Sequence, residues 1–171
     1  MLMAICHSAE DGWAEIQDLA RVSDLRAVQG NLLWAESDVS TLTPEDVDLI
    51  ADEFSLHPLA VEDAVNARQR PKFEVYENHL FVVFDQLDLV NDQLEATQIA
   101  CFVGDRYVLT LHAGAARTLG VAKQRWERAQ RELGQGPGYL LHTLLDSVVD
   151  DYQAIADALE DEVEDLEELV L

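Results

Sequence analysis

The chain has 171 residues, and 49% of them are hydrophobic. This is enough to bury the core of one ordinary domain, and it argues against a disordered chain. Eleven lysines and arginines stand against 34 aspartates and glutamates, which gives a net charge of −23. This charge disfavours nucleic acids and anionic membrane surfaces as direct ligands, because both are bound by basic patches. A saline host would also explain an acidic surface, but the acids gather toward the C-terminal end.

The first part of the chain predicts three short strands and two helices. The strands are apolar or weakly alternating segments, namely Met1–Ser8, Trp13–Leu19 and Leu32–Ala35. Thr43 is a typical N-cap residue, and Pro44 and two acidic residues follow it, which predicts a helix that ends near Ser55. A second proline, Pro58, begins a shorter helix that runs to Val65.

From Lys72 onward the hydrophobic pattern has a period of two, which predicts β-strands. The predicted strands are Phe73–Val75, Leu80–Phe84, Gln98–Val103 and Tyr107–Leu111, and the last two form a hairpin around Gly104-Asp105. A helix from about Ala115 to Leu133 follows and includes Trp126. This helix carries most of the remaining basic residues, which are Arg117, Lys123, Arg125, Arg128 and Arg131. The glycine-rich segment Gly134–Gly138 predicts a loop.

The segment from Glu132 to Leu171 contains no lysine or arginine and carries twelve carboxylates. Its apolar residues recur with the α-helical period of about 3.6. They are Leu141, Leu145, Val148, Tyr152, Ile155, Leu159, Val163, Leu166 and Val170. Like-charged pairs three or four residues apart each destabilise a helix by roughly 0.2–0.5 kcal/mol at low salt. No residue stops the pattern, so we expect one long acidic helix that continues past Leu171 and faces a basic surface, divalent cations or both.

Strands and helices in this order predict an α/β (α+β) fold, in which a mixed sheet is flanked by helices in an αβα sandwich and followed by the long acidic helix. We expect residues 1–134 to form the α/β domain and residues 135–171 to form the first part of the acidic helical region. Cys6 and Cys101 lie in apolar runs and are predicted to be buried thiols in a reducing compartment. No apolar segment of 18 residues and no leader is present, so the chain itself is expected to be soluble and cytosolic.

The motifs of common enzyme classes are missing from the sequence. It contains no glycine-rich phosphate loop, no paired-histidine zinc helix and no nucleophile elbow. The histidines have no ligand spacing and are interpreted as structural; they are His7, His57, His79, His112 and His142. We therefore expect a protein that is not an enzyme. A metal-dependent hydrolase is a third-ranked alternative, because it needs two metals in a pocket or a positioned base that nothing in the sequence supplies.

Two groups of carboxylates are candidates for binding a cation. Glu62 and Asp63 lie in the short predicted helix, near the basic residues Arg68, Arg70 and Lys72. The second group follows the apolar stripe of the acidic helix and comprises Asp146, Asp150, Asp157, Asp161, Glu164 and Glu168. The simpler interpretation of both groups is that they are solvated helix carboxylates, some of them paired with basic residues. Magnesium is typically held by only one or two protein carboxylates, so adjacent Glu and Asp facing an Asp of another surface would suffice.

Two blocks of the sequence form specific motifs. The first block is His57-Pro58-Leu59-Ala60-Val61-Glu62-Asp63-Ala64, which continues through Gln69-Arg70-Pro71-Lys72 and Glu74-Val75-Tyr76. The second block runs from Tyr139-Leu140-Leu141 to Leu145-Asp146-Ser147-Val148-Val149-Asp150-Asp151-Tyr152. These two blocks, in this order, resemble the CorA family of magnesium and cobalt transporters, and the resemblance extends over roughly residues 40–171.

The resemblance implies a homopentameric membrane protein of which this chain is the start of the cytoplasmic regulatory domain, on the inner side of the cell membrane. The family's Gly-Met-Asn pore signature, its stalk helix and both transmembrane helices are not in this sequence. We therefore expect the chain to reach the membrane only through missing C-terminal helices and to conduct no ions by itself.

The resemblance also implies a regulatory cation, Mg²⁺ or another divalent ion such as Co²⁺, which binds between neighbouring subunits, senses the internal concentration and holds the pore shut. By their positions in the two motifs, Glu62, Asp63 and Asp146 correspond to sensing carboxylates of the family. The family's remaining carboxylate lies on the stalk helix of the neighbouring subunit and is missing here. The basic helix from Arg117 to Arg131 is expected to face acidic helices in the assembly.

Glu62-Asp63 within the His-Pro-Leu block favours the magnesium branch of the family over its zinc-transporting relatives, although the pore selects the transported ion. The main alternative is an acidic helical scaffold that binds a basic protein partner and has no metal role. A magnesium-dependent rise in melting temperature that disappears when Glu62 and Asp63 are removed would favour the sensor over the scaffold.

Overall fold

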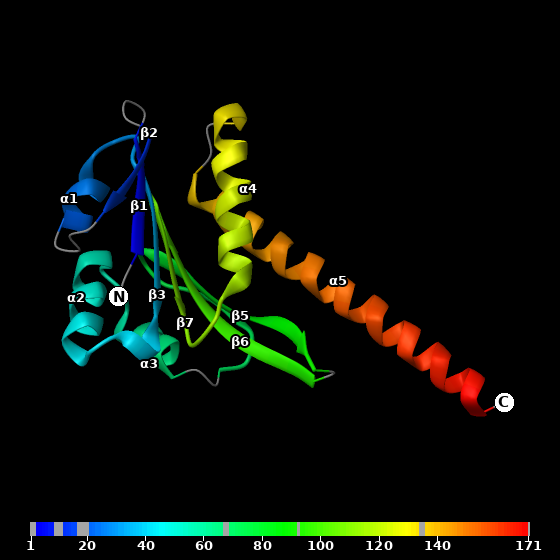
Figure 1. Ribbon diagram of the computed structural model, residues 1–171. Coiled ribbons are helices and arrows are strands. Elements are labelled where there is room, and N and C mark those ends of the chain that lie inside the picture. The colour runs from blue at the N-terminus through cyan, green and yellow to red at the C-terminus, as the bar shows by residue number, and fades with distance from the viewer. Residues whose placement is uncertain are drawn as a thin grey trace.

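The computed structural model describes residues 3–8, 12–16, 21–66, 69–91, 93–133 and 136–170. They form a seven-stranded sheet with helices on both faces, as Figure 1 shows. The strands, in spatial order, are β2 (Gly12–Ile16), β1 (Met3–Ser8), β3 (Leu32–Asp38), β7 (Tyr107–His112), β6 (Gln93–Gly104), β5 (His79–Val90) and β4 (Lys72–Val75). The β3 and β7 strands pair in parallel and the other neighbours pair antiparallel, so the sheet is mixed and the predicted αβα sandwich is confirmed.

The first face of the sheet is covered by α1 (Val22–Ala27), α2 (Pro44–Phe54) and α3 (Pro58–Val65). The α2 helix begins as predicted, because Thr43 and Asp46 form a reciprocal capping box and Pro44 takes the first helical position. A short 3-10 helix, η2 (Val39–Thr41), precedes it. The α1 helix was not predicted, since its six residues are too few to show a helical period.

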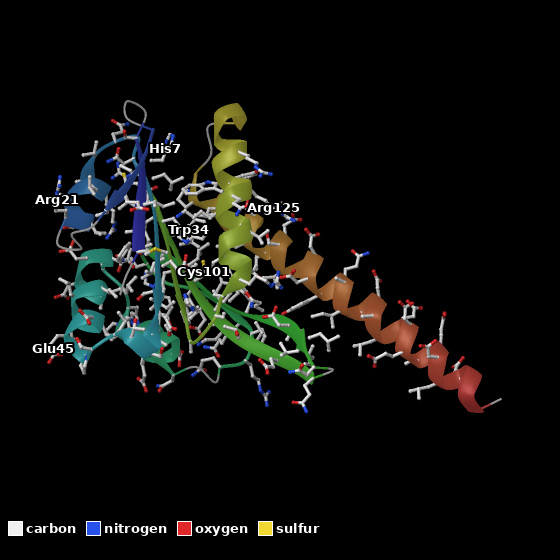
Figure 2. The ribbon with its side chains drawn as sticks, in the orientation of Figure 1. His7, Arg21, Trp34, Glu45, Cys101 and Arg125 are labelled. Carbon is white, nitrogen blue, oxygen red and sulfur yellow. The ribbon has the colours of Figure 1, made fainter. Side chains whose placement is uncertain are left out.

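The second face is covered by α4 (Arg117–Leu133) and the first half of α5 (Pro137–Val170). Successive residues of each strand alternate between the two faces. In β3, Leu33 packs on the first face, whereas Trp34 packs on the second, where its ring lies edge-to-face with that of Trp126 at 5.8 Å. Trp34 and Cys101 both lie on the α4 side of the sheet (Figure 2).

The α5 helix is longer than the surface it covers. Leu140, Leu144 and Val148 are buried against the sheet and α4, whereas the second half of the helix projects away from the domain (Figure 1). The predicted long helix is therefore confirmed, and its first residue, Pro137, shortens the loop predicted for Gly134–Gly138. Gly134 and Gln135 lie outside the described residues.

Several predicted strands are shorter than the observed ones. The β5 and β6 strands pair over their whole length, from His79 opposite Gly104 to Val90 opposite Gln93. Both cysteines are free and buried, as predicted, and burial raises the pKa of each thiol. Within the described ranges, no helix combines the length and apolar character needed to cross a membrane.

Candidate metal centre

The short helix α3 presents two of the three predicted metal ligands. His57 precedes it and accepts a hydrogen bond at Nδ1 from the backbone N–H of Leu59, at 3.3 Å, while Pro58 opens the first turn. Ala60 and Ala64, four residues apart, are buried against the sheet. Their small side chains let the helix lie close to the strands.

Glu62 and Asp63 differ in their surroundings although they are adjacent. Glu62 is exposed, and its carboxylate has no side-chain hydrogen bond or ion pair within the described part of the chain. Asp63 is half-buried and its Oδ2 lies 2.5 Å from Nζ of Lys72. Of the predicted basic neighbours, Lys72 is thus a partner of Asp63, whereas Arg68 lies outside the described residues. The Glu62 carboxylate is therefore free to bind a ligand, whereas the Asp63 carboxylate is already paired with the Lys72 ammonium.

Lys72 belongs to a chain of polar groups along the edge strand β4. Its ammonium also contacts Oε1 of Glu74 at 3.1 Å, and the Tyr76 hydroxyl donates to Oε2 of the same carboxylate at 2.8 Å. Burial opposes the charged form of Lys72, but the hydrogen bonds to Asp63 and Glu74 outweigh it and raise its pKa. The hydrogen bonds from Tyr76 and from Lys72 lower the pKa of Glu74. Both groups are therefore charged at neutral pH.

Tyr76 is itself fixed between two histidine rings. Its ring stacks on His57 at 4.5 Å and on His79 at 5.0 Å. His79 is buried, and burial followed by the nearby charge of His57 lowers its pKa, so its imidazole is neutral at neutral pH. These rings connect the start of α3 to β4 and β5. The structural interpretation predicted for His57 and His79 agrees with these contacts.

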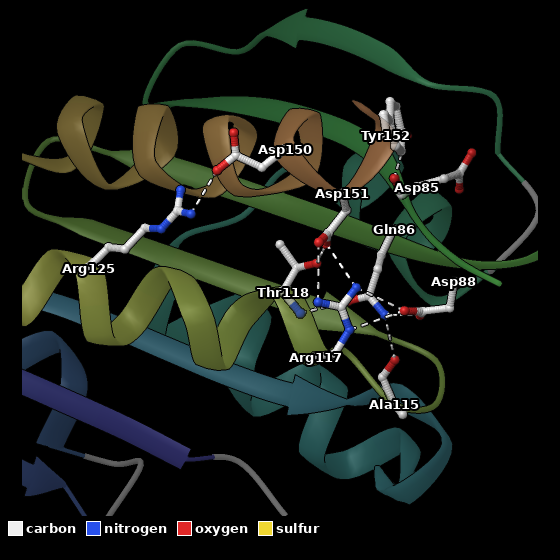
Figure 3. Close-up of polar contacts among 10 residues, drawn as sticks. All are labelled: Asp85, Gln86, Asp88, Ala115, Arg117, Thr118, Arg125, Asp150, Asp151 and Tyr152. Carbon is white, nitrogen blue, oxygen red and sulfur yellow. Dashed lines mark hydrogen bonds and ion pairs between the residues drawn. The ribbon is translucent and has the colours of Figure 1, made fainter. Parts of the chain in front are cut away.

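The third predicted ligand, Asp146, lies on α5 and faces α4. Its Oδ2 lies 3.3 Å from Nη1 of Arg125. Nη2 of the same arginine lies 2.7 Å from Oδ2 of Asp150, a contact that Figure 3 shows. Both carboxylates remain more than half exposed. The basic helix α4 therefore contacts the acidic helix of its own chain, whereas the expectation was that it faces acidic helices in the assembly.

A second arginine connects α4 and α5 to the sheet. Nη2 of Arg117 lies 2.9 Å from Asp88 on β5 and 3.0 Å from Asp151 on α5, and Thr118 Oγ1 donates to Asp151 at 2.8 Å (Figure 3). The buried side chain of Gln86 accepts a hydrogen bond from the backbone N–H of Thr118 at 2.8 Å. This bond satisfies one of the N–H groups that a helix start leaves unpaired. The carboxylates of the docked half of α5 thus have basic or polar partners.

The three predicted ligands do not form a site within one copy of the chain. The α3 helix, which carries Asp63, packs on the first face of the sheet, whereas α5, which carries Asp146, packs on the second. In the part of the chain that the structure describes, no three His, Cys, Asp or Glu side chains are close enough to hold a metal ion. The donors nevertheless fit Mg²⁺, because they are hard carboxylate oxygens on water-accessible surfaces, and both thiols are buried elsewhere.

The fold matches that of a solved CorA soluble domain. The solved structure of the soluble domain of CorA from Methanocaldococcus jannaschii superposes with a TM-score of 0.74 and 17% identity, covering 98% of this chain and 63% of that chain.

The sequence matches the model of the CorA-like Mg²⁺ transporter protein family over residues 31–171, and the chain belongs to this family. It is 30% identical over 156 residues to a putative metal ion transporter of Bacillus subtilis, YfjQ, covering 90% of this chain and 48% of that protein. It is 33% identical over 129 residues to the cobalt/magnesium transport protein CorA of Thermotoga maritima, covering 73% of this chain and 36% of that protein. The chain therefore spans half or less of the length of these relatives.

Proposed function

We propose that the chain is the Mg²⁺-sensing regulatory domain of a CorA-like divalent metal cation transport protein, in which a divalent cation bound between subunits closes the pore. The observation that carries the proposal is the exposed carboxylate of Glu62 beside Asp63 on α3, in a chain of this family. Glu62 and Asp63, with Asp146 on α5, are the residues that would hold the cation. A bound cation would supply positive charge between carboxylates that otherwise repel each other.

The placement of these carboxylates suits a contact between copies. Asp63 and Asp146 lie on opposite faces of the sheet, so a cation shared by both would join two chains. Without it, two such carboxylates 4 Å apart repel each other by about 1 kcal/mol in water, and by more where water is partly excluded. Cation binding then shifts the population of subunit arrangements, because only the closed arrangement brings these carboxylates together.

The remaining features of the whole protein are proposals that follow from the family. They are a homopentamer, transport of Mg²⁺ or Co²⁺, and a position of this domain at the cytoplasmic side of the cell membrane. The division into an α/β regulatory domain over residues 1–134 and a long acidic helical region from 135 onward belongs to the same proposal. The relatives that support it are described as metal ion and cobalt/magnesium transport proteins.

One observation favours the acidic scaffold as a second candidate. The projecting half of α5 exposes Leu159, Val163 and Leu166 between its acidic residues, with exposed fractions of 46% to 61%. A basic amphipathic helix would complement such a surface in both charge and apolar character. In this function Glu62 and Asp63 have no ligand, so the two candidates predict different responses to magnesium.

Thermal unfolding in MgCl₂ at constant ionic strength tests the sensor. A ligand at ten times its dissociation constant stabilises by about 1.4 kcal/mol, which raises the melting temperature of a domain of this size by about 3–6 °C. We expect this rise in the wild type and its loss in Glu62→Ala/Asp63→Ala. The control is Glu164→Ala/Asp165→Ala, which removes two exposed carboxylates of α5 and the same charge. If both variants lose the rise in melting temperature equally, the rise comes from counterion screening. If the melting temperature of the wild type does not change with magnesium, the scaffold is favoured.

A further inference from the structure

Lys72 forms an ion pair with Asp63, one of the proposed magnesium ligands. Its ammonium lies 2.5 Å from Asp63 and 3.1 Å from Glu74, and it stands over the Phe81 ring at 5.2 Å from the centroid. We infer that Lys72 is an intramolecular competitor for the cation at Asp63, which sets the magnesium concentration at which the domain responds. This inference rests on the proposed function, because it concerns the regulation of the same carboxylates.

The surroundings of Lys72 hold the ammonium in place. The lysine lies on β4 opposite Val83 of β5, so its side chain leaves the sheet on the face that α3 covers. Glu74 projects from the same strand on the same face, two residues away, and the Tyr76 hydroxyl orients its carboxylate. The ammonium is therefore bound by α3 and β4 together. A lysine on a mobile surface loop would compete far less, because its side-chain entropy favours the unbound state.

Competition follows from the charges. A divalent cation at Asp63 Oδ2 would stand within a few ångströms of the Lys72 ammonium, and two like charges at that distance repel each other. The lysine must then leave Asp63. Glu74 remains as its partner, so the released ammonium still has a carboxylate. The exchange replaces one ion pair at Asp63 with another, and its cost raises the cation concentration needed for binding.

The size of the effect can be bounded from ion-pair energetics. A pair as accessible as Lys72 and Asp63 changes an equilibrium constant by up to about fivefold, and the repulsion between ammonium and divalent ion adds to this. We expect Lys72→Met to lower the MgCl₂ concentration at the midpoint of the thermal response by about three- to tenfold. Lys72→Arg retains the charge and should stay within about twofold of the wild type.

The chain offers a matched control. Lys123 is its other lysine and lies on α4, on the opposite face of the sheet, so Lys123→Met removes the same charge at a distance from Asp63. We expect no more than a small shift of the midpoint in this variant. The double variant Asp63→Ala/Lys72→Met should have the same midpoint as Asp63→Ala alone, since the competitor acts through this carboxylate. Far-UV circular dichroism without magnesium checks that each variant is folded, and Lys72→Gln serves if Lys72→Met is not.

The outcomes separate this inference from the proposed function. A carboxylate-dependent response in the wild type with an unchanged midpoint in Lys72→Met would overturn the competitor and leave the sensor standing. Equal shifts in Lys72→Met and Lys123→Met would also overturn it, because net charge would explain both. A wild type without a response, together with Lys72→Met that gains one through Asp63, would support the competitor. No response in either protein would overturn both proposals.

Discussion

The two halves of α5 share an amphipathic pattern but differ in the contacts that stabilise them. From Pro137 to Tyr152 the helix buries Leu140, Leu144 and Val148, and its acids pair with Arg117 and Arg125 of α4. From residue 153 onward the described side chains have no ion pair, and the apolar residues are largely exposed. An amphipathic period alone therefore does not stabilise this helix. The first half depends on tertiary packing, whereas the second depends on helix propensity against the repulsion of its own carboxylates.

The boundary between the halves is marked by Tyr152. Its hydroxyl donates a hydrogen bond of 2.5 Å to the backbone carbonyl of Asp85 on β5 (Figure 3). The next apolar residue that is half-buried is Ile155, one turn further along. Substitutions on either side of this boundary should therefore have unequal effects.

The largest effect is expected in the packed core of the first half. Leu144→Ala should lower the free energy of unfolding by about 3 kcal/mol, because it leaves a cavity between α5, α4 and the sheet. The same change at Leu159, in the projecting half, should cost less than about 0.5 kcal/mol, since this side chain is already 46% exposed. Urea unfolding followed by circular dichroism measures both. If both variants lost a similar free energy of unfolding, the second half of α5 would also be packed against other residues, which would contradict the difference between the halves.

A smaller effect is expected at the ion pairs of the first half. Arg117→Met should destabilise the chain by about 1 kcal/mol at low salt, because Asp88 and Asp151 lose their shared partner. The loss should shrink in 1 M NaCl, where the remaining like charges are screened. Arg128→Met is the control, as Arg128 is exposed on the same helix without an ion pair in the described residues. Unfolding in urea at both salt concentrations gives the difference, and equal losses for the two arginines would contradict the role of the bridge.

The smallest effect on global stability is expected in the second half. Glu164→Lys places a basic residue three or four positions from four acids, namely Glu160, Asp161, Glu167 and Glu168. Each pair changes from repulsive to attractive, so the helical ellipticity at 222 nm should rise at low salt. The urea midpoint should shift by an amount equivalent to less than about 0.5 kcal/mol, because this segment adds little to the core. An ellipticity that does not change would show that repulsion does not limit the helix.

Apart from α1 and η2, the sequence predicted the element order, because the local signals are strong and agree with one another. The Thr43 cap, the prolines at positions 44 and 58, and the change from period two to period 3.6 each have a local cause. The face of α5 was predicted less well. Apolar residues occupy both 140–141 and 144–145, and periodicity cannot decide which neighbour of each pair points inward. Packing places Leu140 and Leu144 in the core, whereas Leu141 and Leu145 are only partly buried.

The candidate site was predicted as a set of carboxylates without their partners. Lys72 was named only as part of a nearby basic cluster, because the loop between α3 and β4 hides which of three basic residues reaches Asp63. Alternation along β4 contained a usable signal, since Lys72 and Glu74 must share one face of a strand. Arg125 and Asp146 are twenty-one positions apart, and only the packing of α4 on α5 brings them together.

The placement of Asp63 and Asp146 on opposite faces constrains any assembly that uses both. A contact built from them joins unlike surfaces of successive copies, so it is heterologous and cannot be satisfied by a two-fold dimer. Each copy then has a surface left for the next one, and head-to-tail association continues until rotation closes a ring. The cation that joins one pair of copies would thus be repeated around the ring, once at every junction.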